Sequence, residues 1–210
     1  MRLVLASNNA KKLAELQVLL APLALEIVTQ GSLGIAEADE PHHTFIENAL
    51  VKARHAASEA RGAAIADDSG LCVNALGGAP GVISAHFATI DDVHAEDREA
   101  RRARQDAANN RLLLERLAGA GDRRARFVST LVALRSADDP EPLVAVGRWE
   151  GEILPAPRGH GGFGYDPLMF IPELGCAAAE LAPAVKNAHS HRARSAQQML
   201  ALMREAWHLA

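Results

Sequence analysis

The sequence is poor in cysteine and has no long apolar run. Two cysteines, Cys72 and Cys176, are too few for a disulfide framework and match no metal-ligand spacing, so we expect buried free thiols in a reducing cytoplasm. No apolar stretch approaches the roughly 18 residues of a membrane span. The apolar stretch after Met1 is also too short for a secretory signal. These absences argue against disulfide-rich secreted proteins and membrane-spanning proteins.

Lysine is scarce and positive charge is not in excess. The chain has 26 acidic and 22 basic residues, which argues against a general nucleic-acid binder. Nine arginines and four acids lie between Arg98 and Arg126, a pattern typical of either an RNA-binding face or a solvated helix. The second interpretation is favoured because Phe127 is the aromatic residue nearby that could stack on a base. The lysines number four, at Lys11, Lys12, Lys52 and Lys186.

The 210 residues suit one domain, 1–210, or two closely packed lobes. Apolar runs of strand type alternate with segments of helical periodicity, which predicts an α/β fold. A turn-rich segment between the last two apolar runs predicts an antiparallel hairpin, which we expect to form the second lobe. The predicted strands are 2–6, 25–28, 63–66, 126–134 and 143–153. One helix is predicted to follow residue 9, and the others are predicted at about 44–61, 92–118 and 190–209.

A candidate phosphate site lies between the first predicted strand and its helix, where the chain reads Ser7, Asn8, Asn9, Ala10, Lys11 and Lys12. Serine and asparagine can simply cap the helix. The lysines are harder to explain because cations in a first helical turn oppose the helix dipole unless an anion binds there. Free N–H groups and lysine together favour a phosphate, although no Walker loop is present.

Asp67 and Asp68 follow the strand predicted at 63–66, where active sites of α/β proteins gather. Adjacent side chains of an extended strand cannot share a face, so one aspartate is expected to point to the site and the other elsewhere. An Asx turn with Ser69 and Gly70 is the alternative. Mg²⁺ needs only one or two carboxylates besides substrate phosphates. Its second carboxylate could come from Glu37, Asp39 or Glu40.

A glycine-rich segment, GGFGYDP at 161–167, allows a ligand to approach the backbone, and Phe163 and Tyr165 could stack on a base. A turn-rich connection is the alternative interpretation. His191 and Arg192 begin the last predicted helix, where cations again oppose the dipole and weakly favour a ligand.

Taken together, these segments resemble the Ham1-like family of noncanonical purine nucleoside triphosphate pyrophosphatases, over nearly the whole chain and in the same order. Asn8 departs from the glycine that family members often have, and His86 departs from a common arginine. The matching motifs are Ser7, Asn9, Lys12 and Glu15; Thr44 to Ala49 with Lys52 and Ala53; ADDSG at 66–70; LGGAPG at 76–81; GGFGYDP; and Lys186, Ser190, His191 and Arg192.

The resemblance implies an α/β protein with a mixed central sheet flanked by helices, two lobes with a central substrate cleft, Mg²⁺ dependence and a homodimer. It implies that Ser7 to Lys12 hold the phosphates, that Ser69 contacts substrate, and that Asp68 is the general base and a metal ligand. Among Glu37, Asp39 and Glu40, which align loosely with the family, we choose Glu40 as the second metal ligand. It places the following residues at the nucleoside end: Phe163, Gly164, Tyr165, Asp166, Lys186, His191 and Arg192.

The implied reaction is hydrolysis of dITP, ITP or XTP to the monophosphate and pyrophosphate, with Asp68 orienting or deprotonating a water that attacks the α-phosphorus. A 6-keto acceptor on the base could be satisfied by His191, Arg192 or backbone N–H groups, whereas adenine presents a donor there. Two alternatives remain: a Maf-like pyrophosphatase with another base preference, and a module without catalytic activity that binds RNA or nucleotides.

Overall fold

The computed structural model describes residues 1–91 and 97–209. In this part of the chain the helices are α1 (Ala10–Leu19), α2 (Phe45–Ala60), α3 (Arg98–Arg116), α4 (Pro183–His189) and α5 (His191–Ala206). The strands are β1 (Arg2–Leu5), β2 (Glu26–Thr29), β3 (Ala64–Val73), β4 (Arg124–Leu134), β5 (Leu143–Ile153), β6 (Met169–Ile171) and β7 (Cys176–Ala177).

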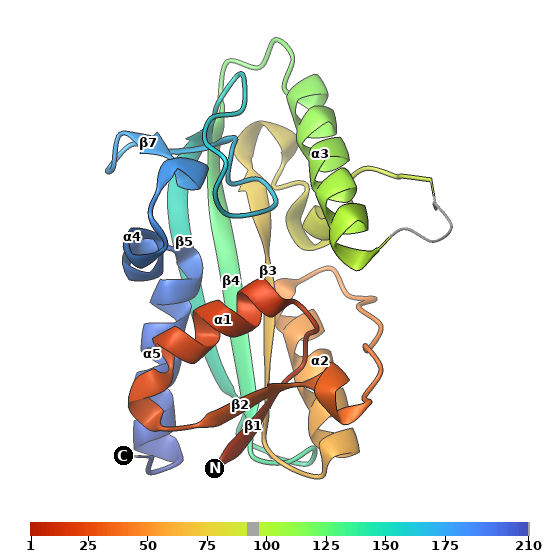
Figure 1. Cartoon of the computed structure of the whole chain (residues 1–210), viewed down its shortest axis with the longest axis vertical. Helices are drawn as coiled ribbons and strands as arrows, with labels where there is room; N and C mark the ends of the chain where they lie inside the picture. Colours follow the sequence, from red (N-terminus) through yellow and green to blue (C-terminus); the bar gives the residue numbers. More distant parts are fainter. Residues whose placement is uncertain (92–96, 210) are drawn as a thin grey trace. The chain divides into compact units, whose positions relative to one another are not determined.

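The strands described form a seven-stranded sheet in the order β2-β1-β3-β4-β5-β6-β7 (Figure 1). Strand β1 pairs in parallel with both β2 and β3, whereas β6 pairs antiparallel with both β5 and β7. The sheet is therefore mixed and flanked by helices, which confirms the predicted fold class. No helix in the described ranges is long and apolar enough to cross a bilayer.

The chain divides into two compact units. The first unit comprises residues 1–69, 128–148 and 187–210, and the second comprises 70–127 and 149–186. Strands β3, β4 and β5 each contribute residues to both units, so the second unit is more than the hairpin lobe expected from sequence.

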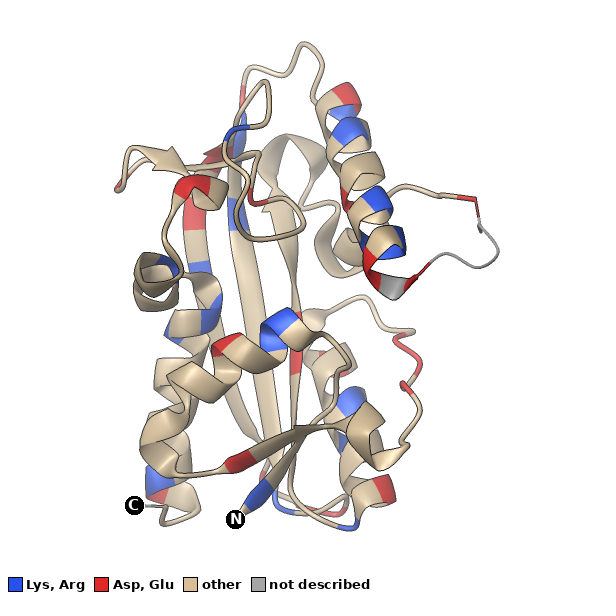
Figure 2. Cartoon of the chain, in the orientation of Figure 1, with Lys and Arg blue, Asp and Glu red and all other residues tan. Residues whose placement is uncertain are grey.

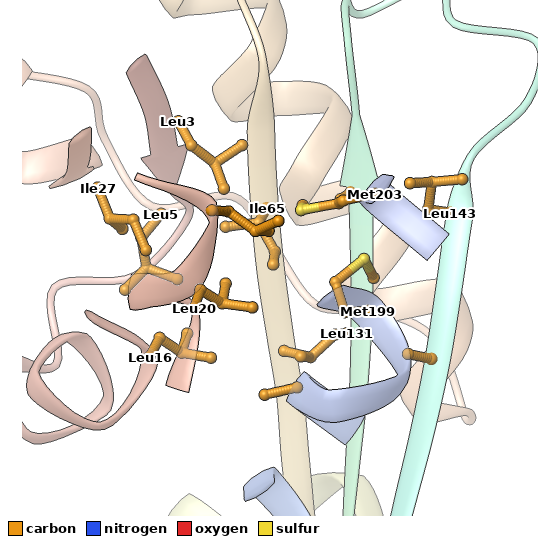
Figure 3. Packing of buried hydrophobic residues seen from close by; sticks show 14 residues of the cluster. Leu3, Leu5, Leu16, Leu20, Ile27, Ile65, Leu131, Leu143, Met199 and Met203 are labelled. Atoms are coloured by element: carbon orange, nitrogen blue, oxygen red, sulfur yellow. The ribbon is translucent and has the colours of Figure 1, made fainter. Parts of the chain in front are cut away.

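The sheet of the first unit is buried on both faces, because successive residues of a strand point to opposite sides. On one face, Leu3 and Leu5 of β1 and Ile65 of β3 pack with Leu16 of α1 and Met199 of α5 (Figure 3). The other face is covered by a stripe of alanines on α2, Ala49, Ala53, Ala56 and Ala57. Small side chains there let the helix backbone approach the sheet closely.

Helix α2 begins where the capping pattern predicts. The Thr44 hydroxyl accepts a hydrogen bond from the backbone N–H of Glu47 at 3.3 Å and donates to the Glu47 carboxylate at 2.5 Å. One orphan N–H of the first turn is thereby satisfied. The helix ends at Ala60, and Arg61 follows in the left-handed conformation.

Helix α5 begins against a glycine of β5. A Cβ atom at Gly147 would overlap the carbonyl oxygen of His191 and the backbone nitrogen of Ser195. Only glycine allows this backbone contact, which sets the position of the first turn of α5 on the sheet. Ser190 caps the helix by accepting from the N–H of Ala193 at 3.2 Å, as predicted.

The second unit has its own core, in which Leu113 and Leu117 of α3 pack with Trp149, Tyr165 and other buried side chains. The helix predicted at 92–118 is observed as α3, and residues 92–96 lie outside the described part of the chain. Basic and acidic residues are interleaved along α3 (Figure 2), as expected for a solvated helix.

Three sequence expectations are corrected. Strand β3 does not end before Asp67 but continues to Val73, so the Asx turn is not formed. The helix α4 and the short strands β6 and β7 were not predicted. Cys72 is buried as expected, whereas Cys176 is partly exposed because it lies on β7, the terminal strand of the sheet order.

Candidate active site

Two adjacent carboxylates in the middle of β3 organise the site, which lies in the first unit. Asp67 is 1% exposed and Asp68 is 5% exposed. Asp67 points to the side of the sheet covered by α1 and α5, and its partners come from those helices and from β4. Asp68 points to the side covered by α2. The expectation that the two aspartates face different ways is therefore confirmed.

Asp67 is a buried anion surrounded by donors. Its Oδ2 atom lies 3.1 Å from Lys12 Nζ and 2.9 Å from Nη2 of Arg192, and it accepts from Ser69 Oγ at 3.2 Å. Burial acts to raise the pKa of Asp67, but the charges of Arg192 and Lys12 outweigh it and hold that pKa far below its ordinary value. Asp67 is thus ionised at any physiological pH.

Arg192 is almost fully buried and holds this arrangement from α5. Its guanidinium pairs with Asp67 and with Glu15 of α1, and it donates to Ser69 Oγ at 3.0 Å. The neighbouring His191 is also buried, with 7% of its surface exposed. The predicted contacts of both residues with a nucleoside stay predictions.

Lys12 reaches from the first turn of α1 to Asp67. Its Nζ atom also donates to the backbone carbonyl of Asp67, at 3.3 Å, and 16% of its side chain is exposed. Burial lowers the pKa of Lys12, although Asp67 opposes that shift. Because 16% of its side chain is exposed, part of this lysine still faces solvent.

Asp68 forms a second cluster with Lys52 and Glu40. The Nζ atom of Lys52 lies 2.8 Å from Asp68 Oδ1 and 2.8 Å from Glu40 Oε2. Burial raises the pKa of Asp68 to about 6, Lys52 opposes this rise and the adjacent Glu40 charge adds to it. A carboxylate that titrates near neutral pH suits a general base.

The residues around Asp68 fit a magnesium ion. Oδ2 of Asp68 is buried and has no hydrogen-bond partner in the described structure, so one carboxylate oxygen remains available. The described residues contain no group of three or more His, Cys, Asp or Glu side chains that could hold a metal. Two carboxylates, with water and phosphate oxygens completing the shell, would be sufficient for Mg²⁺.

The acidic loop, residues 31–41, contributes Glu40 to this cluster. Glu37 instead accepts a hydrogen bond from Asn8 Nδ2 at 2.9 Å, and Asp39 is exposed. Of the three acids considered from sequence, Glu40 is the one that shares Lys52 with Asp68.

The segment from Ser7 to Lys12 enters α1 as predicted. Asn9 caps the helix by accepting from the N–H groups of Lys11 and Lys12, at 3.0 and 3.3 Å, and its own N–H donates to Ser7 Oγ. Asn8 links this segment to the acidic loop, because its Oδ1 accepts from Gly31 N at 2.8 Å. Lys11 and Ala10 are exposed.

The second unit brings together the glycine-rich segment and Lys186. The Nζ atom of Lys186 lies 2.6 Å from Asp166 Oδ2 and 4.9 Å from the centre of the Phe163 ring. Asp166 also accepts from the N–H of Phe163 at 2.8 Å. Tyr165 belongs to the core, and its hydroxyl donates to the carbonyl of Ser84 at 2.9 Å. Gly164 donates to Asp106 at 2.8 Å.

Sequence reasoning noted Lys52 in a motif but assigned it no role in the site. Lys52 and Asp68 are 16 residues apart in the chain, so no local sequence pattern reveals that their side chains meet. The available signal was the scarcity of lysine. Glu15 was likewise noted in a motif without a role in the site. Ser129 and Ser195 belong to no motif, and serine is too common a residue type to be a signal by itself.

The chain is an α/β protein with a mixed sheet, and its site is a pair of buried carboxylates flanked by lysines. The Ham1 family model matches residues 3–202. The chain belongs to the Ham1 family.

Relatives and a solved structure of Ham1 proteins are similar to this chain over nearly its whole length. The chain is 72% identical to the dITP/XTP pyrophosphatase of Methylibium petroleiphilum, covering 99% of each chain. It is 71% identical to the protein of the same name in Leptothrix cholodnii, covering 100% of each. The structure of a HAM1 protein from Coxiella burnetii superposes with a TM-score of 0.85 at 40% identity, covering 98% of this chain and 99% of that one.

Proposed function

We propose that this protein is a nucleoside-triphosphate pyrophosphatase that converts dITP, ITP and XTP to the monophosphate and pyrophosphate. The observation that carries the proposal is the free, buried Oδ2 atom of Asp68 beside Lys52 and Glu40. The high identity to two proteins named dITP/XTP pyrophosphatase supports the same substrates.

In this proposal Asp68 orients the attacking water and takes its proton, since its pKa of about 6 leaves it ionised at neutral pH. Lys12 and the N-terminal segment of α1 bind the phosphates, and Lys52 keeps the carboxylates of Asp68 and Glu40 close together. Mg²⁺ held by Asp68 and Glu40 would polarise the phosphoryl oxygens and neutralise charge on the leaving pyrophosphate.

Other parts of the proposal come from the family resemblance. They are a contact of Ser69 with substrate and contacts of the nucleoside with Lys186, His191, Arg192 and residues 163–166. A single 1–210 domain, a homodimer and a cytoplasmic location belong to the same proposal.

A panel of nucleotides tests the activity. We expect Mg²⁺-dependent release of pyrophosphate from dITP and XTP, with much slower release from dGTP and dATP. Preference for another base would favour the Maf-like alternative. Salt-dependent RNA binding without pyrophosphate release would favour the binding module and overturn the proposal.

Lys12→Ala is expected to raise the KM for dITP by about 10- to 100-fold, because a charge-assisted hydrogen bond contributes roughly 1.5–3 kcal/mol. The ratio of dITP to dATP hydrolysis should change less, since Lys12 is assigned to the phosphates. Arg2→Ala removes an exposed cation of the same unit and serves as the control. Unchanged kcat and KM in Lys12→Ala would remove this lysine from the phosphate site.

A further inference from the structure

Two fully buried serines lie beneath the site, one on β4 and one on α5. Ser129 and Ser195 are both 0% exposed. Ser129 Oγ lies 2.9 Å from Asp67 Oδ1 and 2.9 Å from Ser195 Oγ. Neither serine belongs to the motifs that identify the family resemblance, and the proposed reaction uses neither.

The number of hydroxyl hydrogens sets the direction of these hydrogen bonds. Each serine donates one hydrogen, and an ionised carboxylate can only accept. Ser129 therefore donates to Asp67, which leaves Ser195 as the donor to Ser129. The contact of Ser195 with the carbonyl of Arg192, at 3.1 Å within α5, is the longer alternative. The chain of donors runs from Ser195 through Ser129 to Asp67.

Asp67 in turn contacts both lysines of the site, Lys12 through its carboxylate and Lys52 through its backbone carbonyl. Its Oδ2 atom and its backbone carbonyl accept from Lys12, at 3.1 and 3.3 Å. The same carbonyl accepts from Lys52 at 3.4 Å. Rotation of the Asp67 carboxylate would move the acceptor away from Lys12, and the hydrogen bond from Ser129 to Oδ1 opposes that rotation.

We propose that Ser129 and Ser195 are positioning residues that fix the Asp67 carboxylate and thereby hold Lys12 in place. They act through Asp67 and do not touch the substrate. Preorganised groups gain their effect from being held rigidly before the substrate binds. The kinetic consequence rests on the proposed pyrophosphatase function, whereas the consequence for Lys12 does not.

The scarcity of lysine makes a direct test practical. With ¹³C-labelled lysine, the chain gives signals from only four side chains, Lys11, Lys12, Lys52 and Lys186. In Ser129→Ala we expect the Cε signal of Lys12, which pairs with the Asp67 carboxylate, to shift, while that of Lys186, paired with Asp166, stays in place. An unmoved Lys12 signal in a folded Ser129→Ala protein would overturn the proposal.

Ser84→Ala is the matched control. Ser84 is a buried serine of the second unit that accepts from the N–H of Leu71 and donates to the carbonyl of Gly81. Loss of the Ser84 hydroxyl should lower the melting temperature without shifting the Cε signal of Lys12. If Ser129→Ala fails to fold, Ser195→Ala takes its place, because it leaves the donor on Asp67 intact. A smaller shift of Lys12 is then expected, and no shift would overturn the proposal.

Kinetics give a second, independent readout. Ser129→Ala is expected to lower kcat/KM for dITP by about tenfold, mainly through KM, and Ser195→Ala by about threefold. The double variant should be no worse than Ser129→Ala, because Ser195 acts only through Ser129. Additive losses would contradict the chain of donors. A wild-type protein without turnover would refute the proposed function, while the lysine spectra would still test the positioning pair.

Discussion

Asp68→Asn is expected to lower pyrophosphate release from dITP by about a thousandfold, within the range that general bases contribute. The amide preserves the shape of the side chain, so Lys52 can still donate to its oxygen. It cannot take a proton from water, and it is a poor magnesium ligand. The atom that the substitution changes is Oδ2 of Asp68, which has no hydrogen-bond partner in the described structure.

The same substitution is expected to stabilise the metal-free protein. Burial raises the pKa of Asp68 to about 6, above its ordinary value of 3.8. The folded state therefore prefers the protonated form, and ionisation destabilises it as the pH rises from about 4 to 6. Above that range asparagine should be more stable by about 3 kcal/mol, from about 1.4 kcal/mol per pKa unit, because Glu40 remains as the counterion of Lys52.

Both effects can be measured on one preparation. Urea unfolding at pH 8 in EDTA gives the stability, and pyrophosphate release with added Mg²⁺ gives the activity. Asp138→Asn changes an exposed carboxylate of the first unit and should alter neither. Near-normal hydrolysis of dITP by Asp68→Asn would refute the catalytic assignment. If Asp68→Asn lost stability as well as activity, the loss of activity would be attributed to misfolding instead.

Local sequence signals were sufficient for the start of α1, where the segment from Ser7 to Lys12 lies, and for the starts of α2 and the last helix. Asn9, Thr44 and Ser190 cap α1, α2 and α5 where the pattern predicted, because capping depends on residues three or four positions apart. These signals are short-range and need no tertiary context.

Strand β3 shows where local signals fail. Asp67 to Gly70 has the composition of a turn, yet it continues the strand because tertiary partners satisfy the buried aspartates. Those partners come from α1, α2, β4 and α5, and sequence alone does not reveal that they converge. The same limit explains why the site was predicted as Asp68 with Glu40 but without Lys52, the cation that lies between them.

Asp67→Asn is expected to have the opposite effect to Asp68→Asn, although the residues are neighbours. Asp67 is the anion that Lys12 and Arg192 share within the protein, and Arg192 is 1% exposed. Replacing the carboxylate with an amide leaves the buried Arg192 and the partly buried Lys12 without that counterion. Removal of one partner from a buried ion pair costs about 3–5 kcal/mol. We therefore expect urea unfolding at pH 8 to show a loss of this size.

The pH dependence separates this effect from a simple packing defect. The pKa of Asp67 is far below its ordinary value, so its stabilisation is complete above the unfolded-state pKa of about 3.9 and is lost as the pH falls below it. The difference in unfolding free energy between wild type and Asp67→Asn should be constant from pH 5 to 8 and narrow below about pH 4. A packing defect would give a difference independent of pH. Equal stability of the Asp67→Asn and Asp68→Asn proteins would refute the division of roles between the two faces of β3.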